Sequence, residues 1–314
     1  MQAELRRQVR LSYEQAVHAR HRLRVLRGQD SLYSEFLRAA NLRFKTGEVA
    51  RLEPATALVR QGETQAQLRQ ARTDYAVARR QLQALLQVPA AVVVADSLLQ
   101  PLVSSVAVGL VDSATAALQD TVLRLTNPQA LVLQQQVRER QAATRAEQAL
   151  GLPSFTLGYF NQSLIGPQTV GGVGGPERYY GGSDRFQGVT AGVALPLLRG
   201  PQKARVQAAR LQEQVAQTQA RRYQAELAAR VEELQARRQE LVERVQFYEQ
   251  TGLPQAAVIV RLSTRAFKAG EMGYSEYLLN LDRALQLRTA HLDALLAHNQ
   301  TIIELDYLLG TAAQ

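Results

Sequence analysis

The four histidines of the chain fall into two pairs, and imidazole pairs at helical spacing are a common element of metal sites. His18 and His21 are three residues apart and would share one helix face, and His291 and His298 are seven residues apart. A metal site needs three or four converging ligands, whereas each pair supplies two and the chain has no cysteine. We therefore interpret the histidines as packing or solvent-facing residues and predict no metal site.

The known catalytic motifs are missing from the sequence. It contains no nucleophile elbow, no HExxH, no P-loop, and no GxGxxG between a strand and a helix. The glycine run 171–175 is expected to be a loop, because no strand before it leads into a helix after it. We predict that the protein is not an enzyme and has no cofactor.

The charge of the chain is strongly positive, with 37 Lys and Arg against 28 Asp and Glu. Nucleic acid or anionic lipid could be the partner of such a chain. The basic residues are interleaved with acids along helical segments, as in Arg230-Val231-Glu232-Glu233, which is typical of a solvated helix face. A nucleic-acid-binding coiled coil would have a concentrated basic run and strongly salt-dependent binding. We therefore expect no nucleic-acid partner.

An internal repeat organises the elements around these residues. The segment Phe44-Lys45-Thr46-Gly47-Glu48 returns 223 residues later as Phe267-Lys268-Ala269-Gly270-Glu271. At the same offset Leu58 matches Leu281, and Arg60 matches Arg283. Each copy reads as a long helix, a glycine turn and a second long helix, which predicts a protein built from two halves. We place the first, truncated half at 1–126 and the second, complete half at 127–314.

Heptad-like apolar spacing predicts the helices of both hairpins. The first hairpin has helices at about 3–45 and 53–87 around Gly47, followed by a less regular segment at 90–126 with a helix expected near 108–124. Asn127-Pro128 is a helix start signal, and that helix ends at Gly151. A helix from about 201 to 249 follows, and Gly252-Leu253-Pro254 interrupts it before the second hairpin, which begins near 255 and turns at Gly270.

The periodicity changes to two between the helices. Residues 154–160 carry aromatic and β-branched side chains, and in 188–195 the side chains of Val189, Ala191, Val193 and Leu195 would share one face. The segment 154–195 therefore predicts a β-hairpin, either in a membrane barrel or in a soluble sheet packed on a helix. Its connection 161–187 is expected to be a long glycine-rich loop, of the kind that membrane barrels place outside the cell.

The order of these motifs resembles the TolC-like outer membrane efflux family, the exit ducts of tripartite pumps. The resemblance rests on 43–49 and 267–272 at the two turns, on 127–128 with 152–159, and on 194–197 with Gly200 and 203–205. The residues around 251–256 and Asn299-Gln300 are most similar to the heavy-metal branch. The resemblance implies a mainly α fold of long coiled-coil helical hairpins, an α-barrel protomer, with one antiparallel β-hairpin inserted from a membrane β-barrel.

The resemblance also implies partners and sites. It implies a homotrimer in outer membrane lipid with a periplasmic helical tube, a periplasmic adaptor protein and an RND inner-membrane transporter. The tip turns would dock the adaptor through Gly47, Glu48, Val49, Gly270, Glu271 and Met272, although ordinary hairpin turns are the alternative. Glu276 would form a ring of three carboxylates that attracts cations, or would simply stabilise the first turn of its helix. The duct would pass its substrate, heavy-metal cations, passively.

The first half departs from the family pattern, because its opening helix and its β-hairpin are missing. The sequence shows no signal peptide and no run of 18 apolar residues. Three copies with two strands each would supply six strands, below the roughly eight of the smallest membrane barrels. We therefore expect an N-terminally truncated chain. The alternatives are a soluble coiled-coil scaffold, in which 154–195 is dispensable, and a non-functional fragment of the duct.

Overall fold

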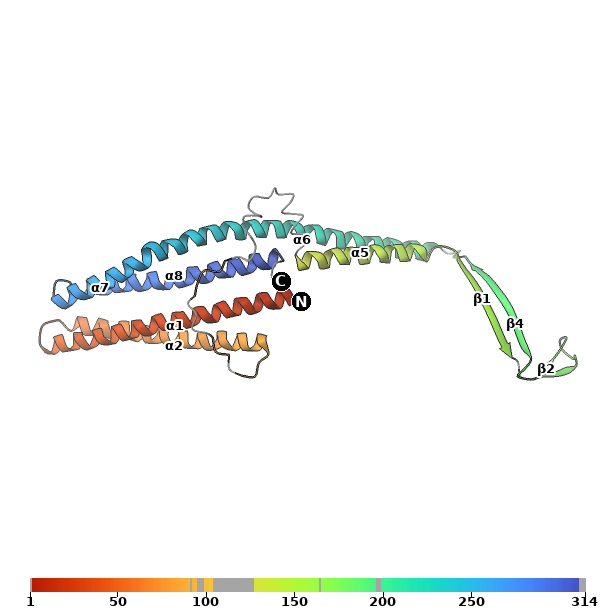
Figure 1. The fold of residues 1–314 in the computed structure, drawn as a ribbon, viewed down its shortest axis with the longest axis horizontal. Helices are drawn as coiled ribbons and strands as arrows, with labels where there is room; N and C mark the ends of the chain where they lie inside the picture. Colours follow the sequence, from red (N-terminus) through yellow and green to blue (C-terminus); the bar gives the residue numbers. More distant parts are fainter. Residues whose placement is uncertain are drawn as a thin grey trace. The chain divides into compact units, whose positions relative to one another are not determined.

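The computed structural model describes residues 2–90, 92–94, 99–103, 127–163, 165–195 and 199–310 (Figure 1). The helix expected near 108–124 lies outside these residues. None of the described helices is both long and apolar enough to cross a membrane. The helices and strands, in chain order, are α1 Gln2–Lys45, α2 Leu52–Leu86, α5 Pro128–Ala149, β1 Ser154–Ser163, β2 Gly166–Thr169, β3 Glu177–Tyr180, β4 Arg185–Ala194, α6 Arg199–Phe247, η1 Tyr248–Gly252, α7 Leu253–Ala269 and α8 Tyr274–Leu308.

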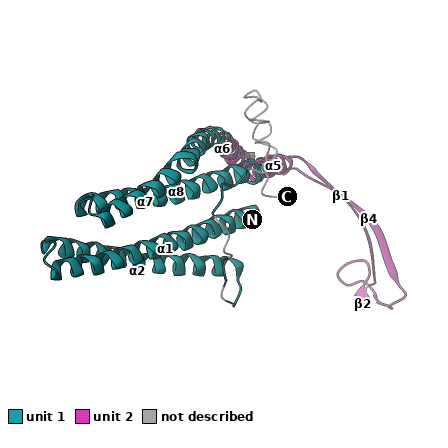
Figure 2. Ribbon diagram, turned by 60° about the vertical axis from the view of Figure 1, so that its left-hand side comes forward, with its two compact units in different colours: residues 1–131, 223–314 teal, residues 132–222 magenta. Residues whose placement is uncertain are grey.

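The chain divides into two compact units (Figure 2). Unit 1 consists of 1–131 and 223–314 and contains both helical hairpins, and unit 2 consists of 132–222 and contains the strands with the helices that flank them. The predicted fold class, long helical hairpins with one inserted β-hairpin, is confirmed. The division of the sequence at Asn127 into two repeats describes internal similarity and stays a prediction.

The first hairpin of unit 1, α1 with α2, is held together along its length by apolar side chains at helical spacing. Leu23 and Leu26 of α1 pack against Leu68 and Ala71 of α2, and all four are buried. Charged side chains cover the opposite faces, so each helix is stabilised by burial of one stripe rather than by propensity alone. The predicted bounds of both helices are confirmed to within about one residue, within the usual uncertainty of helix ends.

The second hairpin begins differently from the prediction. The residues at 252–254 do not break the helix, because α6 continues into α7 through a π-helical turn, η1. The Leu253 N–H donates to the Tyr248 carbonyl, five residues back. Pro254 has no N–H, and in an α-helix its ring would press on the carbonyl four residues earlier. The wider π turn accommodates this proline and lets the helix continue.

A shared apolar cluster joins the two hairpins near their turns. Phe36 lies at its centre, with ring-centroid distances of 5.5 Å to Phe267, 4.9 Å to Tyr274 and 5.7 Å to Tyr277. Ala57 of α2 is fully buried in the same cluster. Aromatic pairs at these distances add to the energy of apolar burial. The cluster therefore fixes the two turns at the same end of unit 1 (Figure 1).

Asn127 fastens the start of α5 within unit 1. Its Oδ1 accepts hydrogen bonds from the Ala130 N–H at 2.9 Å and from the Tyr223 hydroxyl at 3.1 Å. Its Nδ2 donates to the Leu308 carbonyl at 3.0 Å. The predicted Asn cap with Pro128 at the first helical position is therefore confirmed, and the same side chain also binds α6 and the end of α8.

The long β-hairpin of unit 2 pairs β1 with β4 in antiparallel register over ten positions, Ser154↔Ala194 to Ser163↔Arg185. The apolar side chains of Phe155, Leu157 and Tyr159 lie opposite Val193, Ala191 and Val189, so they form one apolar face. The other face carries mostly small or polar residues, with Phe160 and Phe186 toward the far end of the hairpin. There, a Cβ at Gly188 would meet the Phe160 ring at 2.6 Å, so a side chain at position 188 would require this ring to move.

The connection between β1 and β4 is more ordered than the sequence predicted. A second, short antiparallel ladder pairs β2 with β3 within 161–187. The expected uninterrupted loop is therefore wrong, because Gly166–Thr169 and Glu177–Tyr180 pair around the glycine run at 171–175. The rings of Tyr180 and Phe186 pack edge to face at 5.4 Å, which connects the short ladder to β4.

Candidate functional site

The turn of the first hairpin is a compact loop centred on Gly47. Gly47 has φ +79°, the left-handed region that only glycine enters without strain. The Glu48 N–H donates to the Arg43 carbonyl at 2.9 Å, which satisfies one of the last carbonyls of α1. Thr46 donates its hydroxyl to the exposed Glu48 carboxylate at 2.9 Å. The turn therefore presents Glu48 in a fixed position, beside the half-buried Val49.

The turn of the second hairpin repeats this geometry. Gly270 has φ +76°, and the Glu271 N–H donates to the Ala266 carbonyl at 3.0 Å. The Glu271 side chain is exposed, whereas Met272 is half-buried and packs against the shared apolar cluster. Both tip glycines therefore have a positive φ. The six predicted docking residues thus lie in two like-built turns at the same end of unit 1 (Figure 1).

Glu276 lies in the first turn of α8 on its exposed side. Tyr274, Tyr277 and Leu278 of the same turns are buried, so the carboxylate points away from the apolar cluster. The exposed neighbour on its side is Leu279. An exposed first-turn carboxylate favours the helix macrodipole and is also free to meet mobile cations. The fold leaves both predicted roles of Glu276 possible.

A polar contact between the two hairpins was missed by the sequence analysis. The Tyr33 hydroxyl of α1 donates to the Asp282 carboxylate of α8, and the Arg60 guanidinium of α2 lies 3.4 Å from the same carboxylate. Arg60 also pairs with Glu63 at 3.1 Å. Burial and the nearby Asp282 carboxylate raise the pKa of Tyr33 well above its ordinary value, so this phenol stays protonated as a donor.

A signal for this contact exists in the repeat. At the offset of 223 residues, Asp282 of the second copy stands where the first copy has Val59, which is exposed. The two copies match at the leucine and the arginine on either side of this position. A carboxylate that replaces an apolar residue in an otherwise matching motif marks a contact that one half makes and the other does not.

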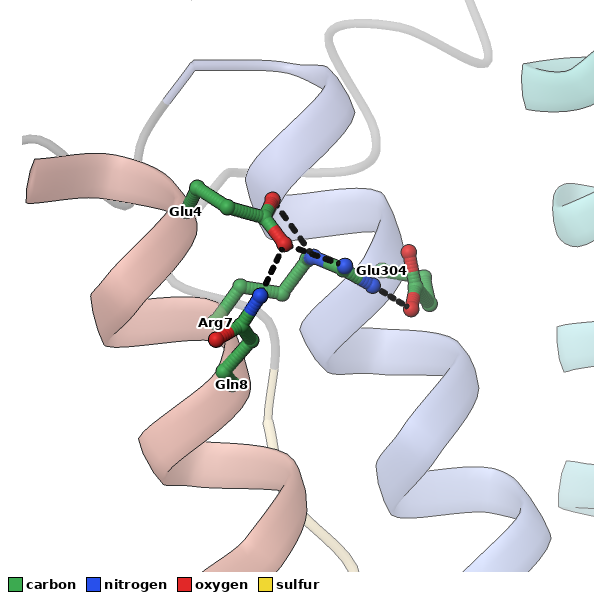
Figure 3. Close-up of polar contacts among 4 residues, drawn as sticks. All are labelled: Glu4, Arg7, Gln8 and Glu304. Atoms are coloured by element: carbon green, nitrogen blue, oxygen red, sulfur yellow. Dashed lines mark hydrogen bonds and ion pairs between the residues drawn. The ribbon is translucent and has the colours of Figure 1, made fainter. Parts of the chain in front are cut away.

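The contact between α1 and α8 combines apolar clusters with several polar pairs. Near the chain start, Arg7 pairs with Glu4 at 2.6 Å and with Glu304 of α8 (Figure 3). The hydrogen bond from Arg7 lowers the pKa of Glu4. One turn further on, Arg10 lies 2.9 Å from Asp306, whose side chain is fully buried. Buried carboxylates need such partners, because an unpaired charge in the interior is costly.

Asn299, one of the residues of the family resemblance, is buried in the middle of this contact. Its Nδ2 donates to Glu14 Oε2 at 2.8 Å and to the Gln100 carbonyl at 2.9 Å. Its Oδ1 accepts the Leu102 N–H at 2.9 Å. Asn299 therefore fastens the segment 99–103 to α8 and α1, which gives this motif residue a structural role.

The histidines do not form one cluster. The His18 imidazole lies 2.8 Å from the Asp293 carboxylate, and His21 is buried on the same helix. His291 lies 3.6 Å from Glu249, and His298 contacts the neighbouring Asn299 at 3.3 Å. Burial lowers the pKa of His18, although Asp293 acts in the opposite direction. In the described part of the chain, no three His, Asp or Glu side chains are placed to hold a metal ion.

Solved structures with the same arrangement of helices and strands are outer membrane proteins. CusC, described as forming a transmembrane channel, matches at a TM-score of 0.78 with 17% identity, over 96% of this chain and 66% of its own. The CmeC outer membrane channel of Campylobacter jejuni matches at 0.80 with 14% identity, over 99% and 63%. The MtrE outer membrane channel of Neisseria gonorrhoeae matches at 0.75 with 19% identity, over 98% and 66%. The chain has the fold of the TolC-like outer membrane channels.

This TolC-like fold agrees with the resemblance of the sequence motifs. No protein-family model and no curated protein matches the sequence. The chain spans about two thirds of the length of the channel structures that it matches. In the TolC-like fold of this chain, the two glycine turns and the apolar face of the β1–β4 hairpin both present exposed groups to partners.

Proposed function

We propose that the chain is an exit-channel subunit of a tripartite efflux system in the outer membrane. The observation that carries this proposal is the β1–β4 hairpin, whose apolar face is uncovered. Phe155, Leu157 and Val189 are 78%, 83% and 71% exposed. A contiguous apolar face of this kind is a liability in water and is stable against lipid. The TolC-like fold supports the same conclusion.

The dimensions of the hairpin support a crossing of the membrane. Each long strand has ten residues, and a transmembrane β-strand has about 9–11. On the opposite face, Gly158, Thr190 and Gly192 are small or polar, as expected for residues that line a water-filled lumen. We place the hairpin in the outer membrane and the helical hairpins in the periplasm.

The proposed assembly is a homotrimer with two protein partners. A hairpin of two strands cannot close alone, because its outer edges would be left unpaired in lipid, so further strands must pair with it. Three copies of this hairpin by themselves would supply six strands, fewer than the roughly eight of the smallest membrane barrels. The tip turns at Gly47 and Gly270 would meet a periplasmic adaptor protein through Glu48, Val49, Glu271 and Met272. An RND transporter in the inner membrane would supply the energy, and the channel would carry out no chemical step.

Heavy-metal cations are the proposed substrate. The support is the similarity of 251–256 and Asn299-Gln300 to the heavy-metal branch and the exposed carboxylate of Glu276. Asn299 itself is buried in a structural network, so it supports membership of the branch rather than contact with the ion. In a trimer, three Glu276 carboxylates would raise the local cation concentration at the narrow end of the tube.

A deletion experiment tests the proposal against a soluble scaffold. The full chain and a variant in which 154–195 is replaced by a short glycine linker are compared for flotation with phosphatidylcholine vesicles. We expect the full chain to float and to require detergent for extraction, and the variant to remain soluble and helical. A full chain that stays in the aqueous phase would support the scaffold alternative. Metal tolerance of cells lacking their own exit channel then separates a working duct from an inactive fragment.

A further inference from the structure

Unit 2 has a groove at the junction of α5 and α6 with the β1–β4 hairpin. It has a volume of about 610 Å³ and is formed by the end of α5 and the first turns of α6. Its apolar wall is made by Leu152, Pro153 and Val206, and its charged wall by Lys203 and Arg210. One side of the groove is therefore apolar and the other is cationic.

The shape of the groove is fixed by contacts between the two helices. Gln202 Nε2 donates to the Glu147 carbonyl at 2.5 Å, which satisfies one of the last carbonyls of α5. A Cβ at Gly151 would lie 3.3 Å from the Gln148 carbonyl and 3.6 Å from the Gln202 side chain. The chain thus leaves α5 close against α6, and these contacts fix the backbone on both sides of the groove.

The cationic wall is a regular feature of α6. Lys203 and Arg210 are seven residues apart, so they lie on one face of the helix, about 10 Å apart along its axis. Both side chains are exposed, and among the described residues neither makes a hydrogen bond or an ion pair. In the described part of unit 2, no acidic side chain lines the groove, and Glu147, in the last turn of α5, interacts with Gln202 at 3.3 Å.

The positive charge of the chain is concentrated in this unit. Between 132 and 222 there are eleven basic and five acidic residues, a net charge of +6 out of +9 for the whole chain. Solvated helix faces with interleaved acids and bases do not explain why the excess positive charge lies in this unit. A basic region beside a membrane-spanning segment is the usual way in which proteins recognise anionic lipid.

The apolar wall of the groove leads directly into the apolar face of the strands. Leu152, 64% exposed, is followed within three residues by Phe155, which is 78% exposed and begins the apolar row of β1. A ligand with an anionic head and apolar tails would satisfy both features at once. Its phosphate would meet Lys203 and Arg210, and its acyl chains would cover the strand face.

We propose that this groove binds the phosphate headgroup of an anionic glycerophospholipid. The proposal rests on the proposed function, because it requires the β1–β4 hairpin to lie in a membrane. The groove then lies at the water–lipid boundary and sets how deeply the hairpin enters the membrane. The two cations stay at the depth of the headgroups, and the strands enter the hydrocarbon region. Each basic side chain at an anionic surface strengthens binding by roughly fivefold.

The experiment compares the full chain with two doubly substituted variants of equal charge. Lys203→Gln with Arg210→Gln removes the cationic wall. Arg145→Gln with Arg221→Gln removes two exposed arginines elsewhere on the same two helices. Partition of each protein is measured into phosphatidylcholine vesicles and into phosphatidylcholine–phosphatidylglycerol vesicles. We expect the unsubstituted chain and the Arg145/Arg221 variant to favour the anionic vesicles, and the Lys203/Arg210 variant to lose this preference by on the order of tenfold.

Each outcome has a separate meaning. Equal losses in both variants would overturn the site in favour of general charge attraction. Suppression of the preference by millimolar inorganic phosphate at constant ionic strength would mean that the groove binds free phosphate, not lipid. If the Lys203/Arg210 variant changes its oligomeric state but keeps its lipid preference, the groove binds a neighbouring copy of the chain and not lipid. If the unsubstituted chain binds neither kind of vesicle, the membrane function fails, whereas binding without preference overturns the headgroup site alone.

Discussion

Tyr33 of α1 and Asp282 of α8 lie 249 residues apart in sequence, and the phenol donates a hydrogen bond to the carboxylate. Asp282 also lies 3.4 Å from Arg60 of α2, so one carboxylate joins three helices of the two hairpins. A cavity of about 380 Å³ lies beside this contact, and all three side chains line it. Where the packing leaves space, polar contacts rather than apolar burial hold the first hairpin to the second.

The contribution of this contact can be measured with Tyr33→Phe. The change removes the hydroxyl from a fully buried side chain and leaves Asp282 with Arg60 alone. We expect the free energy of unfolding to fall by about 1.5–3 kcal/mol, the usual contribution of a hydrogen bond to a charged group. Urea unfolding followed by circular dichroism measures it. Tyr75→Phe is the control, because Tyr75 packs against two apolar clusters without a hydrogen bond among the described residues. Equal losses for both variants would assign the effect to packing.

The geometry of the second tip turn predicts the effects of glycine substitutions. Gly270 has φ +76°, so Gly270→Ala should destabilise the protein by about 1–2 kcal/mol through backbone strain. Gly28 lies inside α1 with open space where a Cβ would be, so Gly28→Ala should stabilise it by about 0.5–1 kcal/mol. Thermal unfolding of the two variants should shift in opposite directions. Shifts of the same sign would show that the turn tolerates a side chain.

The docking role of the same turn is tested separately. Gly270→Val distorts the loop that presents Glu271 and Met272, whereas the helices on both sides are held by the apolar cluster around Phe36. We expect loss of efflux, measured as substrate tolerance in cells with the matching pump, with the helical content of the protein preserved. Normal efflux by a folded Gly270→Val variant would contradict docking through this turn.

From the environment of His18, we expect the free energy of unfolding to decrease in weak acid. Burial lowers its pKa in the folded protein below the ordinary value of about 6.5, against the opposing effect of Asp293. Above that value the imidazole is neutral in both states and contributes nothing. As the pH falls below it, the unfolded chain takes up the proton more readily, so the free energy of unfolding decreases.

The His18 effect is checked by unfolding measurements at pH 7 and pH 5. We expect His18→Gln to reduce the decrease in stability between these pH values, because the group that gains the proton is gone. Asp293→Asn should enlarge the decrease, because the carboxylate that favours the protonated imidazole has been removed. An unchanged pH dependence in both variants would show that other groups control it.

From the exposed carboxylate of Glu276, we expect the assembled channel to prefer cations. Glu276→Gln removes one negative charge per copy from the exposed side of α8, so the reversal potential in a salt gradient should shift toward lower cation selectivity. The control is Glu243→Gln, which removes an exposed carboxylate from α6. An unchanged selectivity in the Glu276 variant would leave the carboxylate with its role in the first turn of the helix, worth about 0.3–1 kcal/mol.

Much of the fold was predictable because its elements are long and periodic. Stripes such as Leu23 and Leu26 recur over many helical turns, and a glycine with positive φ ends the first helix of each hairpin. The positions of β1 and β4 were predictable from the alternation of apolar with small or polar residues. This alternation can be recognised within a segment of few residues. The π turn before Pro254 was missed because apolar periodicity does not distinguish a change in helix type from a break.

The candidate site was less accessible from the sequence. The tip turns were predictable from the repeat. Both turns require a residue with positive φ, so both copies of the repeat have glycine at this position. The Tyr33–Asp282 contact depends on which faces of two distant helices meet, and a single sequence contains no such information. The groove at Lys203 was not predictable from the sequence, because the chain has many interleaved charges. Lys203 and Arg210 differ from the other basic residues only in their position beside the apolar strand face that follows Leu152.

The register of the β1–β4 hairpin restricts how its length can change. Phe155, Leu157 and Tyr159 face the same side as their partners on β4 because the two strands pair position by position. Loss of one residue from the middle of β4 would turn every later side chain of that strand to the opposite face, whereas loss of two would restore the original order. Insertions and deletions that survive selection in this hairpin should therefore come in even numbers per strand, or be confined to the connection at 164–184.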